Sequence, residues 1–318
     1  MHGLWLEDQK LSFRDDLANP VPESGEALIK MRLAGICSTD LELWRGYYPY
    51  HDILGHEFVG EVVEAPGRED LAGERVVGSI SITCGECEAC LAGRKSHCIN
   101  RKTLGIRNHA GVFADYLTLP IGNLYLVPDV VSDDEAVFTE PLAAALEIQE
   151  QVHIQPGMRV LVVGAGRLGM LIAQTLALTG CDLNVVVRRE EPALLLSSLG
   201  IKSIDVSEVQ NSMADLVVEV TGSPQGFALS RKAVRPKGTL VLKSTFAGDV
   251  SLDLSSLVVD EISVIGSRCG PFAPALRLLA AKRINPLPLI ESRFPLEKGV
   301  EALEHARQPG ILKVLLFP

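Results

Sequence analysis

The sequence contains no apolar stretch of about eighteen residues or more, so it predicts no membrane-spanning helix. Its start, MHGLWLEDQK, lacks the basic residues and the apolar core of a signal peptide, and the cytoplasm is the expected location. Basic residues are in deficit, 30 against 40 acidic ones, and the net charge of −10 argues against nucleic acid or a membrane surface as a partner. Internal repeats and low-complexity segments are also missing. The composition favours a protein whose partner is a small molecule.

Cysteines are few, and they are unevenly placed. Of the seven, four form one short motif: Cys84, Cys87, Cys90 and Cys98. Four thiolates at this spacing can reach the corners of a tetrahedron, which is the usual structural zinc site, with no position left for a substrate. Cys181 and Cys269 have no partner at metal-ligand spacing and are expected to be buried thiols. We expect reduced cysteines and no disulfide framework.

A glycine-rich turn lies at the centre of the chain. The run VLVVGAGRLG, Val160–Gly169, begins as a strand buried on both faces and continues into a helical pattern. Its three glycines permit a tight reversal, backbone approach to a pyrophosphate and close packing of the helix. The pyrophosphate would lie on the free N–H groups of a helix N-terminus. We therefore expect a dinucleotide to bind at Gly164, Gly166, Arg167, Leu168 and Gly169.

The first part of the chain, up to about residue 130, reads as short strands separated by Gly, Pro and acidic turns. The expected strands are Ala27–Leu33, Phe58–Glu64, Glu74–Ser79 and Phe113–Leu119. One helical pattern interrupts them at Ser38–Trp44. This pattern predicts an irregular β-rich domain.

After a helical stretch at Ser132–Val152, strand and helix patterns alternate, as in βαβ units. The expected strands are Arg159–Val163, Leu183–Val187, Leu216–Val220, Gly238–Leu242 and Ile262–Gly266. The expected helices are Leu168–Thr179, Pro192–Leu199 and Gln225–Val234. The alternation predicts an α/β domain with a doubly wound parallel sheet, which carries the glycine-rich turn at its carboxyl edge.

The last segment changes pattern again. Its expected elements are a helix at Ala275–Lys282, a Pro-rich link at Asn285–Pro288, a helix at Leu296–Ala306 and a strand at Lys313–Phe317. This tail is too short for a core of its own. We expect domains at residues 1–135 and 136–270, with residues 271–318 returning to complete the first.

A second group of potential metal ligands is spread over three segments: GICSTD at 35–40, GHE at 55–57 and TEP at 139–141. One thiolate, one imidazole and one carboxylate would leave the fourth position of a zinc ion open for water or an alcohol oxygen. By spacing alone, a buried thiol at Cys37 and a structural histidine at His56 are the simpler interpretation.

Together these motifs resemble the zinc-dependent branch of the medium-chain dehydrogenase/reductase superfamily, which includes alcohol, polyol and threonine dehydrogenases. The resemblance runs nearly end to end. It rests on GICSTD at 35–40, GHEFVGEVVEAPG at 55–67, the four cysteines at 84–98, TEPLA at 139–143 and VLVVGAGRLG at 160–169. It implies a GroES-like catalytic domain, a Rossmann nucleotide-binding domain and two zinc ions per chain.

The resemblance also implies roles for single residues. Cys37 and His56 match the family's catalytic zinc ligands. The third ligand would be Glu140, with Glu57 as an alternate or exchanging ligand. Thr39 matches the hydroxyl that takes the substrate's proton.

The chain departs from the family at the next step of the proton route. Many relatives carry a histidine five residues after the zinc cysteine, whereas this chain has Glu42, which either relays protons or is simply solvated. Asp40 is a candidate cap for the helix that follows. The aromatic stretch WRGYYPY, residues 44–50, either lines the substrate cleft or forms a packing cluster.

The choice of nicotinamide cofactor depends on the end of the second strand. NAD sites have an acidic residue there, about twenty residues beyond the glycines. Here the strand ends at Val187 without an acid, and Arg188 and Arg189 follow. We hypothesise that this pair receives the 2′-phosphate of NADP. The alternative is NAD, with Glu190 or Glu191 turned back to the ribose.

The resemblance implies a zinc-dependent, NAD(P)-dependent dehydrogenase that transfers a hydride between the cofactor and a secondary alcohol or ketone of a polyol, sugar or amino alcohol. An NADPH-dependent biosynthetic aldehyde or ketone reductase is the alternative among enzymes. A non-catalytic nucleotide-binding or structural protein is the alternative from another class. Residues 243–245, KST, either touch the cofactor or form a plain strand-to-loop junction. The expected assembly is a homodimer or homotetramer, with the strand at Ile262–Gly266 as its candidate edge.

Overall fold

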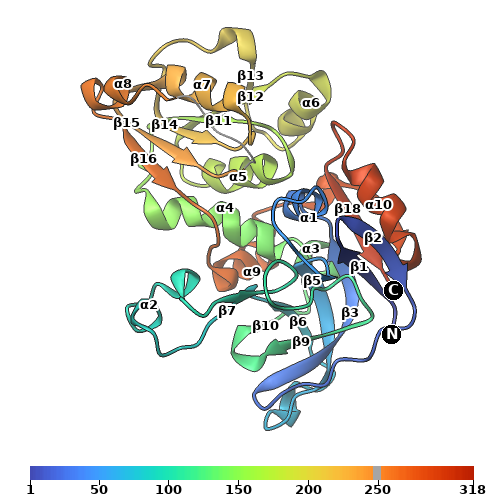
Figure 1. Cartoon of the computed structure of the whole chain (residues 1–318). Coiled ribbons are helices and arrows are strands. Elements are labelled where there is room, and N and C mark those ends of the chain that lie inside the picture. Colours follow the sequence, from blue (N-terminus) through green and yellow to red (C-terminus); the bar gives the residue numbers. More distant parts are fainter. Residues whose placement is uncertain (246–251) are drawn as a thin grey trace. The chain divides into compact units, whose positions relative to one another are not determined.

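A computed structural model describes residues 1–245 and 252–318 (Figure 1). The chain forms two compact units, one of residues 1–140 with 272–318 and the other of residues 141–271. These boundaries lie a few residues beyond those expected from the sequence. Among the described residues, no helix is long and apolar enough to cross a membrane.

The first unit is built on a mixed sheet. Its strands are β3 (Glu26–Gly35), β5 (Glu57–Glu64), β6 (Arg75–Gly78), β9 (Tyr116–Pro120), β10 (Leu124–Leu126), β17 (Ile290–Pro295) and β18 (Lys313–Phe317). The order is β10-β6-β5-β3-β18-β17, and β9 also pairs with β3. Buried side chains alternate along β3, as in a strand with one face in the core. Because β18 pairs with both β3 and β17, the last segment of the chain completes this sheet.

Smaller elements surround this sheet. One small sheet contains β1 (Gly3–Glu7), β2 (Lys10–Arg14) and β4 (Asp52–Ile53). Another pairs β7 (Ser81–Ile82) with β8 (Lys102–Thr103). The helices are α1 (Ser38–Trp44), α2 (Glu88–Leu91), α3 (Asp133–Ala136), α9 (Phe272–Ala280) and α10 (Gly299–Ala306). The longer α4 (Thr139–Gln151) begins in the first unit and continues in the second.

Acidic residues in the first turn of α3 hold the returning segment in place. Asp134 accepts two hydrogen bonds from Arg293 at 2.5 and 2.9 Å, and Lys282 lies 2.7 Å from Glu135. Acidic groups are favourable at this end of a helix because it carries partial positive charge. Both pairs join residues more than a hundred positions apart within the first unit.

The second unit contains a six-stranded parallel sheet. Its strands are β11 (Arg159–Val163), β12 (Asp182–Val187), β13 (Ser203–Asp205), β14 (Ala214–Glu219), β15 (Val234–Leu242) and β16 (Ser263–Gly266). The connecting helices are α5 (Arg167–Ala177), α6 (Glu190–Ser198), α7 (Pro224–Ala233) and α8 (Leu254–Val259). The order β13-β12-β11-β14-β15-β16 extends in both directions from β11. Right-handed crossovers therefore place helices on both faces of the sheet (Figure 1).

The predicted fold class is confirmed: a doubly wound parallel sheet accompanies a β-rich unit. The predicted bounds of α1 and β18 match those of the structure. The strand expected at Phe113–Leu119 begins only at Tyr116, because the N–H of Phe113 donates instead to Leu54, at 2.9 Å, outside the ladder. Eight strands in the described part of the chain have no counterpart among the predicted ones: β1, β2, β4, β7, β8, β10, β13 and β17.

Candidate metal and nucleotide sites

Three potential metal ligands of different chemistry come together in the first unit. One ligand atom each from Cys37, His56 and Glu57 lie within 4.8 Å of one another. Cys37 follows β3 as the N-cap residue of α1, and the other two stand at the start of β5. The antiparallel register that sets Gly35 opposite Glu57 brings the segments together. The group has the thiolate, imidazole and carboxylate donors that zinc accepts.

Asp40 fixes the first two ligands. Its carboxylate is fully buried and accepts the backbone N–H of Cys37 at 2.8 Å, while its other oxygen lies 3.1 Å from Nδ1 of His56. A carboxylate on one ring nitrogen orients the imidazole so that Nε2 is left for a metal. Burial alone would lower the pKa of His56, but the charges of Asp40 and Cys37 outweigh it and raise that pKa. Asp40 stands at the third position of α1, so the expected cap is a capping box with Cys37 at the N-cap.

Glu57 has a buried cationic partner. Its carboxylate forms an ion pair with Nζ of Lys313 from β18, and the two side chains are 1% and 4% exposed. Lys313 also lies 3.4 Å from the carbonyl oxygen of Ile36 and stands over the ring of Phe138. Gly35 leaves room for the pair, because a Cβ there would lie 2.5 Å from Oε2 of Glu57. No local motif marks Lys313 in the sequence, so the pattern does not predict it as a site residue.

The remaining residues expected near this group are placed as follows. The hydroxyl of Thr39, which is half-buried, lies 3.8 Å from Sγ of Cys37. Glu140 is half-buried in the first turn of α4 and does not join the group of three ligands. Glu42 accepts a hydrogen bond from Arg45 at 2.5 Å, so its carboxylate is already paired.

The four clustered cysteines form a second potential metal site. The Sγ atoms of Cys84, Cys87, Cys90 and Cys98 all lie within 4.8 Å of one another. Backbone N–H groups of Cys90 and Ile99 lower the pKa of Cys87 to about 6, which favours the thiolate form that a metal requires. Burial raises the pKa of Cys90 to about 11. Four convergent thiols fit a closed tetrahedral zinc site.

The glycine-rich turn has the geometry that a pyrophosphate site requires. Gly164 has φ +120°, a conformation that side chains disfavour. Gly169 faces the turn so closely that a Cβ would lie 2.0 Å from the carbonyl oxygen of Gly164. A Cβ on Gly166, at the N-cap of α5, would meet nothing within 4 Å. The turn is therefore tight where the chain packs and open where a phosphate would approach. Arg167 and Leu168 begin α5 and are half-buried.

Arg188 and Arg189 lie at the same edge of this sheet. They follow β12, which pairs with β11 directly before the turn. Both side chains are exposed, and neither makes a hydrogen bond or ion pair with the residues that the structure describes. Glu190 and Glu191 lie in the first turn of α6 and are exposed.

Other predicted features have simple structural roles. Tyr50 is buried and donates its hydroxyl hydrogen bond to the carbonyl of Ile53 at 2.7 Å, so this end of the aromatic stretch packs in the core. Lys243 is buried and donates to Oγ of Ser267 at 3.0 Å, which joins β15 to the segment after β16. Cys181 and Cys269 form no disulfide and are only half-buried, so the expectation that both are buried was wrong.

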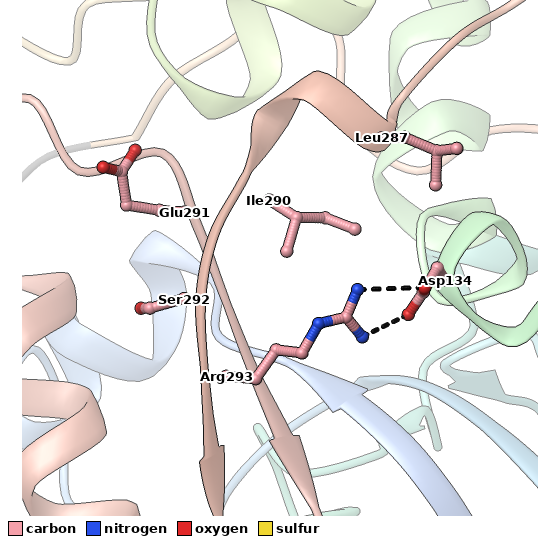
Figure 2. A pocket seen from close by; sticks show the side chains of 6 residues that line it. All are labelled: Asp134, Leu287, Ile290, Glu291, Ser292 and Arg293. Carbon is pink, nitrogen blue, oxygen red and sulfur yellow. Dashed lines mark hydrogen bonds and ion pairs between the residues drawn. The ribbon is translucent and has the colours of Figure 1, made fainter.

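A pocket of about 470 Å³ contains none of these residues. It lies along β17 and is lined by Asp134, Leu287, Ile290, Glu291, Ser292 and Arg293 (Figure 2). The side chains of Arg293 and Asp134 point toward each other and are joined by two hydrogen bonds (Figure 2). Because the guanidinium is already neutralised, the pocket has no free charge from this pair.

Comparisons with known proteins identify the family of this chain. Residues 23–129 match the alcohol dehydrogenase GroES-like domain, and residues 168–281 match the zinc-binding dehydrogenase family. The L-galactonate-5-dehydrogenase of Escherichia coli K12 is 30% identical over 90% of this chain and 89% of its own. The sorbitol dehydrogenase of Halalkalibacterium halodurans is 29% identical over 94% of this chain and 93% of its own. A zinc-binding dehydrogenase structure from Sinorhizobium meliloti, bound to NADP, covers 100% of this chain and 99% of its own at 28% identity, with a TM-score of 0.92.

Proposed function

The chain belongs to the zinc-containing medium-chain alcohol dehydrogenase superfamily, and we propose that it oxidises a secondary alcohol of a polyol, sugar or amino alcohol, or reduces the matching ketone. It is a zinc-dependent NAD(P) alcohol dehydrogenase that acts on CH–OH groups. The observation that carries the substrate class is the ligand group of Cys37, His56 and Glu57, in which a carboxylate takes the place of a second thiolate. The sorbitol and galactonate relatives support a substrate with several hydroxyl groups.

Cys37 and His56 would hold the catalytic zinc with Glu57, and Glu140 is the alternate third ligand. Zinc at this position acts as a Lewis acid that lowers the pKa of the substrate hydroxyl. The carboxylate of Glu57 would either stay paired with Lys313 or bind the metal. Lys313 thereby offsets the charge of Glu57 whenever the metal does not.

The proton of the alcohol is given to Thr39, whose hydroxyl lies 3.8 Å from the Cys37 sulfur. Asp40 keeps His56 oriented and does not take the proton, because both of its oxygens already have partners. The next acceptor after Thr39 would be Glu42, which must first leave Arg45. The glycine-rich turn would hold the dinucleotide, whose nicotinamide would supply the hydride acceptor.

The preferred cofactor is NADP. Arg188 and Arg189 are exposed, form no hydrogen bond or ion pair through their side chains with the described residues, and follow the strand that flanks the glycine-rich turn. Two guanidinium groups suit a 2′-phosphate better than a neutral ribose hydroxyl. Comparison of kcat/KM for NADP and NAD, in the wild type and in Arg188→Ala/Arg189→Ala, tests this assignment. A wild type that prefers NAD contradicts it.

The protein forms a homodimer or homotetramer through the edge of the second unit's sheet. β16 pairs with β15 alone among the described strands, so its other edge is available. Apolar side chains are exposed on it and on the preceding helix, namely Leu254, Val258, Val259 and Val264. Such an edge is normally covered in solution, here by a second copy. Sedimentation should show an oligomer that Val264→Lys dissociates.

A screen of alcohols and carbonyl compounds with both cofactors tests the activity itself. The absorbance of the reduced nicotinamide should rise with a polyol, sugar or amino alcohol, and Cys37→Ala should abolish turnover while the fold persists. Strong NADPH oxidation with aldehydes or ketones, and poor alcohol oxidation, would indicate the biosynthetic reductase. Loss of all turnover in a chain that binds both zinc and nucleotide would indicate the non-catalytic alternative.

A further inference from the structure

We infer that Arg107 binds an anionic group, a phosphate or a carboxylate, on the substrate of this dehydrogenase. The inference rests on the proposed function and narrows its substrate class from polyhydroxy compounds in general to those that carry a negative charge. It is carried by a short turn of the first unit, residues 103–107.

This turn is pressed against the segment that supplies a metal ligand. The N–H of Arg107 donates to the carbonyl of Thr103 at 2.8 Å, and the N–H of Thr103 donates back at 2.8 Å, which closes the turn. Gly105 between them has φ +63°, and a Cβ there would lie 1.8 Å from the carbonyl oxygen of Gly55. Gly55 directly precedes His56. Only glycine permits this approach, and it brings Arg107 close to the metal site.

Tyr48 gives a second, independent measure of that placement. Its hydroxyl donates a hydrogen bond to the carbonyl of Ile106, next to Arg107. Burial raises the pKa of this half-buried phenol, while the positive charges of Arg107 and His56 both act to lower it. The guanidinium and the imidazole therefore both lie close enough to the same hydroxyl to influence it. Arg107, Tyr48 and His56 therefore lie in the same region of the first unit.

The charge of Arg107 is available for a ligand. Its side chain is exposed, and among the residues that the structure describes it makes no hydrogen bond or ion pair. Arg293, in the pocket of Figure 2, is by contrast joined to Asp134 by two hydrogen bonds. The planar fork of the Arg107 guanidinium matches a carboxylate or a phosphate in two parallel hydrogen bonds.

The reacting hydroxyl and the anionic group would then be held by different residues. The metal held by Cys37, His56 and Glu57 would bind the hydroxyl, and Arg107 would bind the charged end of the same molecule. Binding that is equally strong in the ground state and the transition state lowers KM and leaves kcat unchanged. Removal of Arg107 should therefore raise KM for anionic substrates without a comparable effect on kcat.

The test compares one neutral and two anionic substrates: sorbitol, sorbitol 6-phosphate and L-galactonate. The variants are Arg107→Ala, Arg107→Lys and, as the matched control, Arg283→Ala. Arg283 is another exposed arginine of the first unit, so this control removes the same charge from a different segment. Steady-state kcat and KM are measured for each pair with the holoenzyme and the preferred cofactor.

The wild type should favour at least one anionic substrate over sorbitol. Arg107→Ala should lower kcat/KM for that substrate by about 10- to 100-fold, the worth of a charge-assisted hydrogen-bonded pair, and should change the value for sorbitol by less than about twofold. For the anionic substrate, the kcat/KM of Arg107→Lys should lie between those of the wild type and Arg107→Ala. Arg283→Ala should have the kcat/KM values of the wild type. The phosphate and carboxylate arms identify which anion is bound.

Two results separate the failure of this inference from that of the proposed function. A wild type that oxidises sorbitol with no preference for either anion, or an Arg107→Ala variant that loses sorbitol and anion turnover equally, overturns the role of Arg107 and leaves the dehydrogenase standing. A wild type that turns over no polyol, sugar or amino alcohol and no matching ketone, neutral or anionic, overturns both.

Discussion

Replacement of Lys313 by methionine tests how the charge of Glu57 is held. The pair is almost fully buried, with side chains 4% and 1% exposed, so solvent screens it little. Removal of one partner from a buried ion pair leaves an uncompensated charge and costs about 3–5 kcal/mol. Methionine keeps most of the volume of the lysine stem, so the loss should come from charge and not from a cavity. For a unit of this size, each kcal/mol shifts Tm by about 2–4 °C, and Lys313→Met should lower it by roughly 6–20 °C.

Differential scanning calorimetry of the enzyme after a chelator has removed the catalytic zinc measures this effect, because no metal can then offset the charge of Glu57. The matched control is Lys282→Met, whose pair with Glu135 is similar in length but leaves the lysine 54% exposed, so its loss should stay within about 1 kcal/mol. The double variant Lys313→Met/Glu57→Gln removes both charges and should recover part of the lost Tm. A Tm of Lys313→Met within about 2 °C of the wild type would refute the reasoning, as would a double variant no more stable than Lys313→Met.

Three further predictions concern the other sites. Asp40→Asn removes the carboxylate that orients His56, so it should lower zinc affinity or turnover by about 10- to 100-fold. Chelator competition measures the zinc affinity, and an unchanged affinity would contradict this prediction. Gly166→Ala should fold normally and weaken cofactor binding, whereas Gly169→Ala should lower Tm, since its Cβ would lie 2.0 Å from a carbonyl oxygen; equal Tm values would contradict this. The lowered pKa of Cys87 favours its thiolate form at neutral pH, and protons compete with zinc for this sulfur as the pH falls. Acid titration should therefore release the structural zinc and lower Tm, and a zinc content that does not change as the pH is lowered would contradict this.

Local patterns predicted the elements that have strong periodicity or sharp ends. The helix at Ser38–Trp44 and the strand at Lys313–Phe317 have the expected bounds, and the five predicted strands of the parallel sheet all exist. β13 has only three residues, too few for a period to be recognised. β17, with the sequence IESRFP, alternates weakly and follows the predicted Pro-rich link at Asn285–Pro288, so the pattern assigns no element to it.

The candidate sites show the same division between local and distant information. Two of the sites are local motifs, the four cysteines between Cys84 and Cys98 and the glycine-rich turn. The cysteine sulfurs lie together as the spacing predicts, and the glycines form a tight turn. The partner of Glu57 is Lys313, 256 residues away, and only the pairing of β18 with β3 brings them together. Arg107 was not singled out, because its meaning depends on the contact between Gly105 and Gly55.

Zinc content, measured by mass spectrometry in the wild type and in Cys37→Ala, tests the central claim most directly. The claim is that Cys37, His56 and a carboxylate hold one catalytic zinc while the four clustered cysteines hold another. The wild type should contain two zinc ions per chain, and Cys37→Ala should retain one and lose turnover. A Cys37→Ala variant that keeps both ions, or a fully active wild type with only one, would contradict the account.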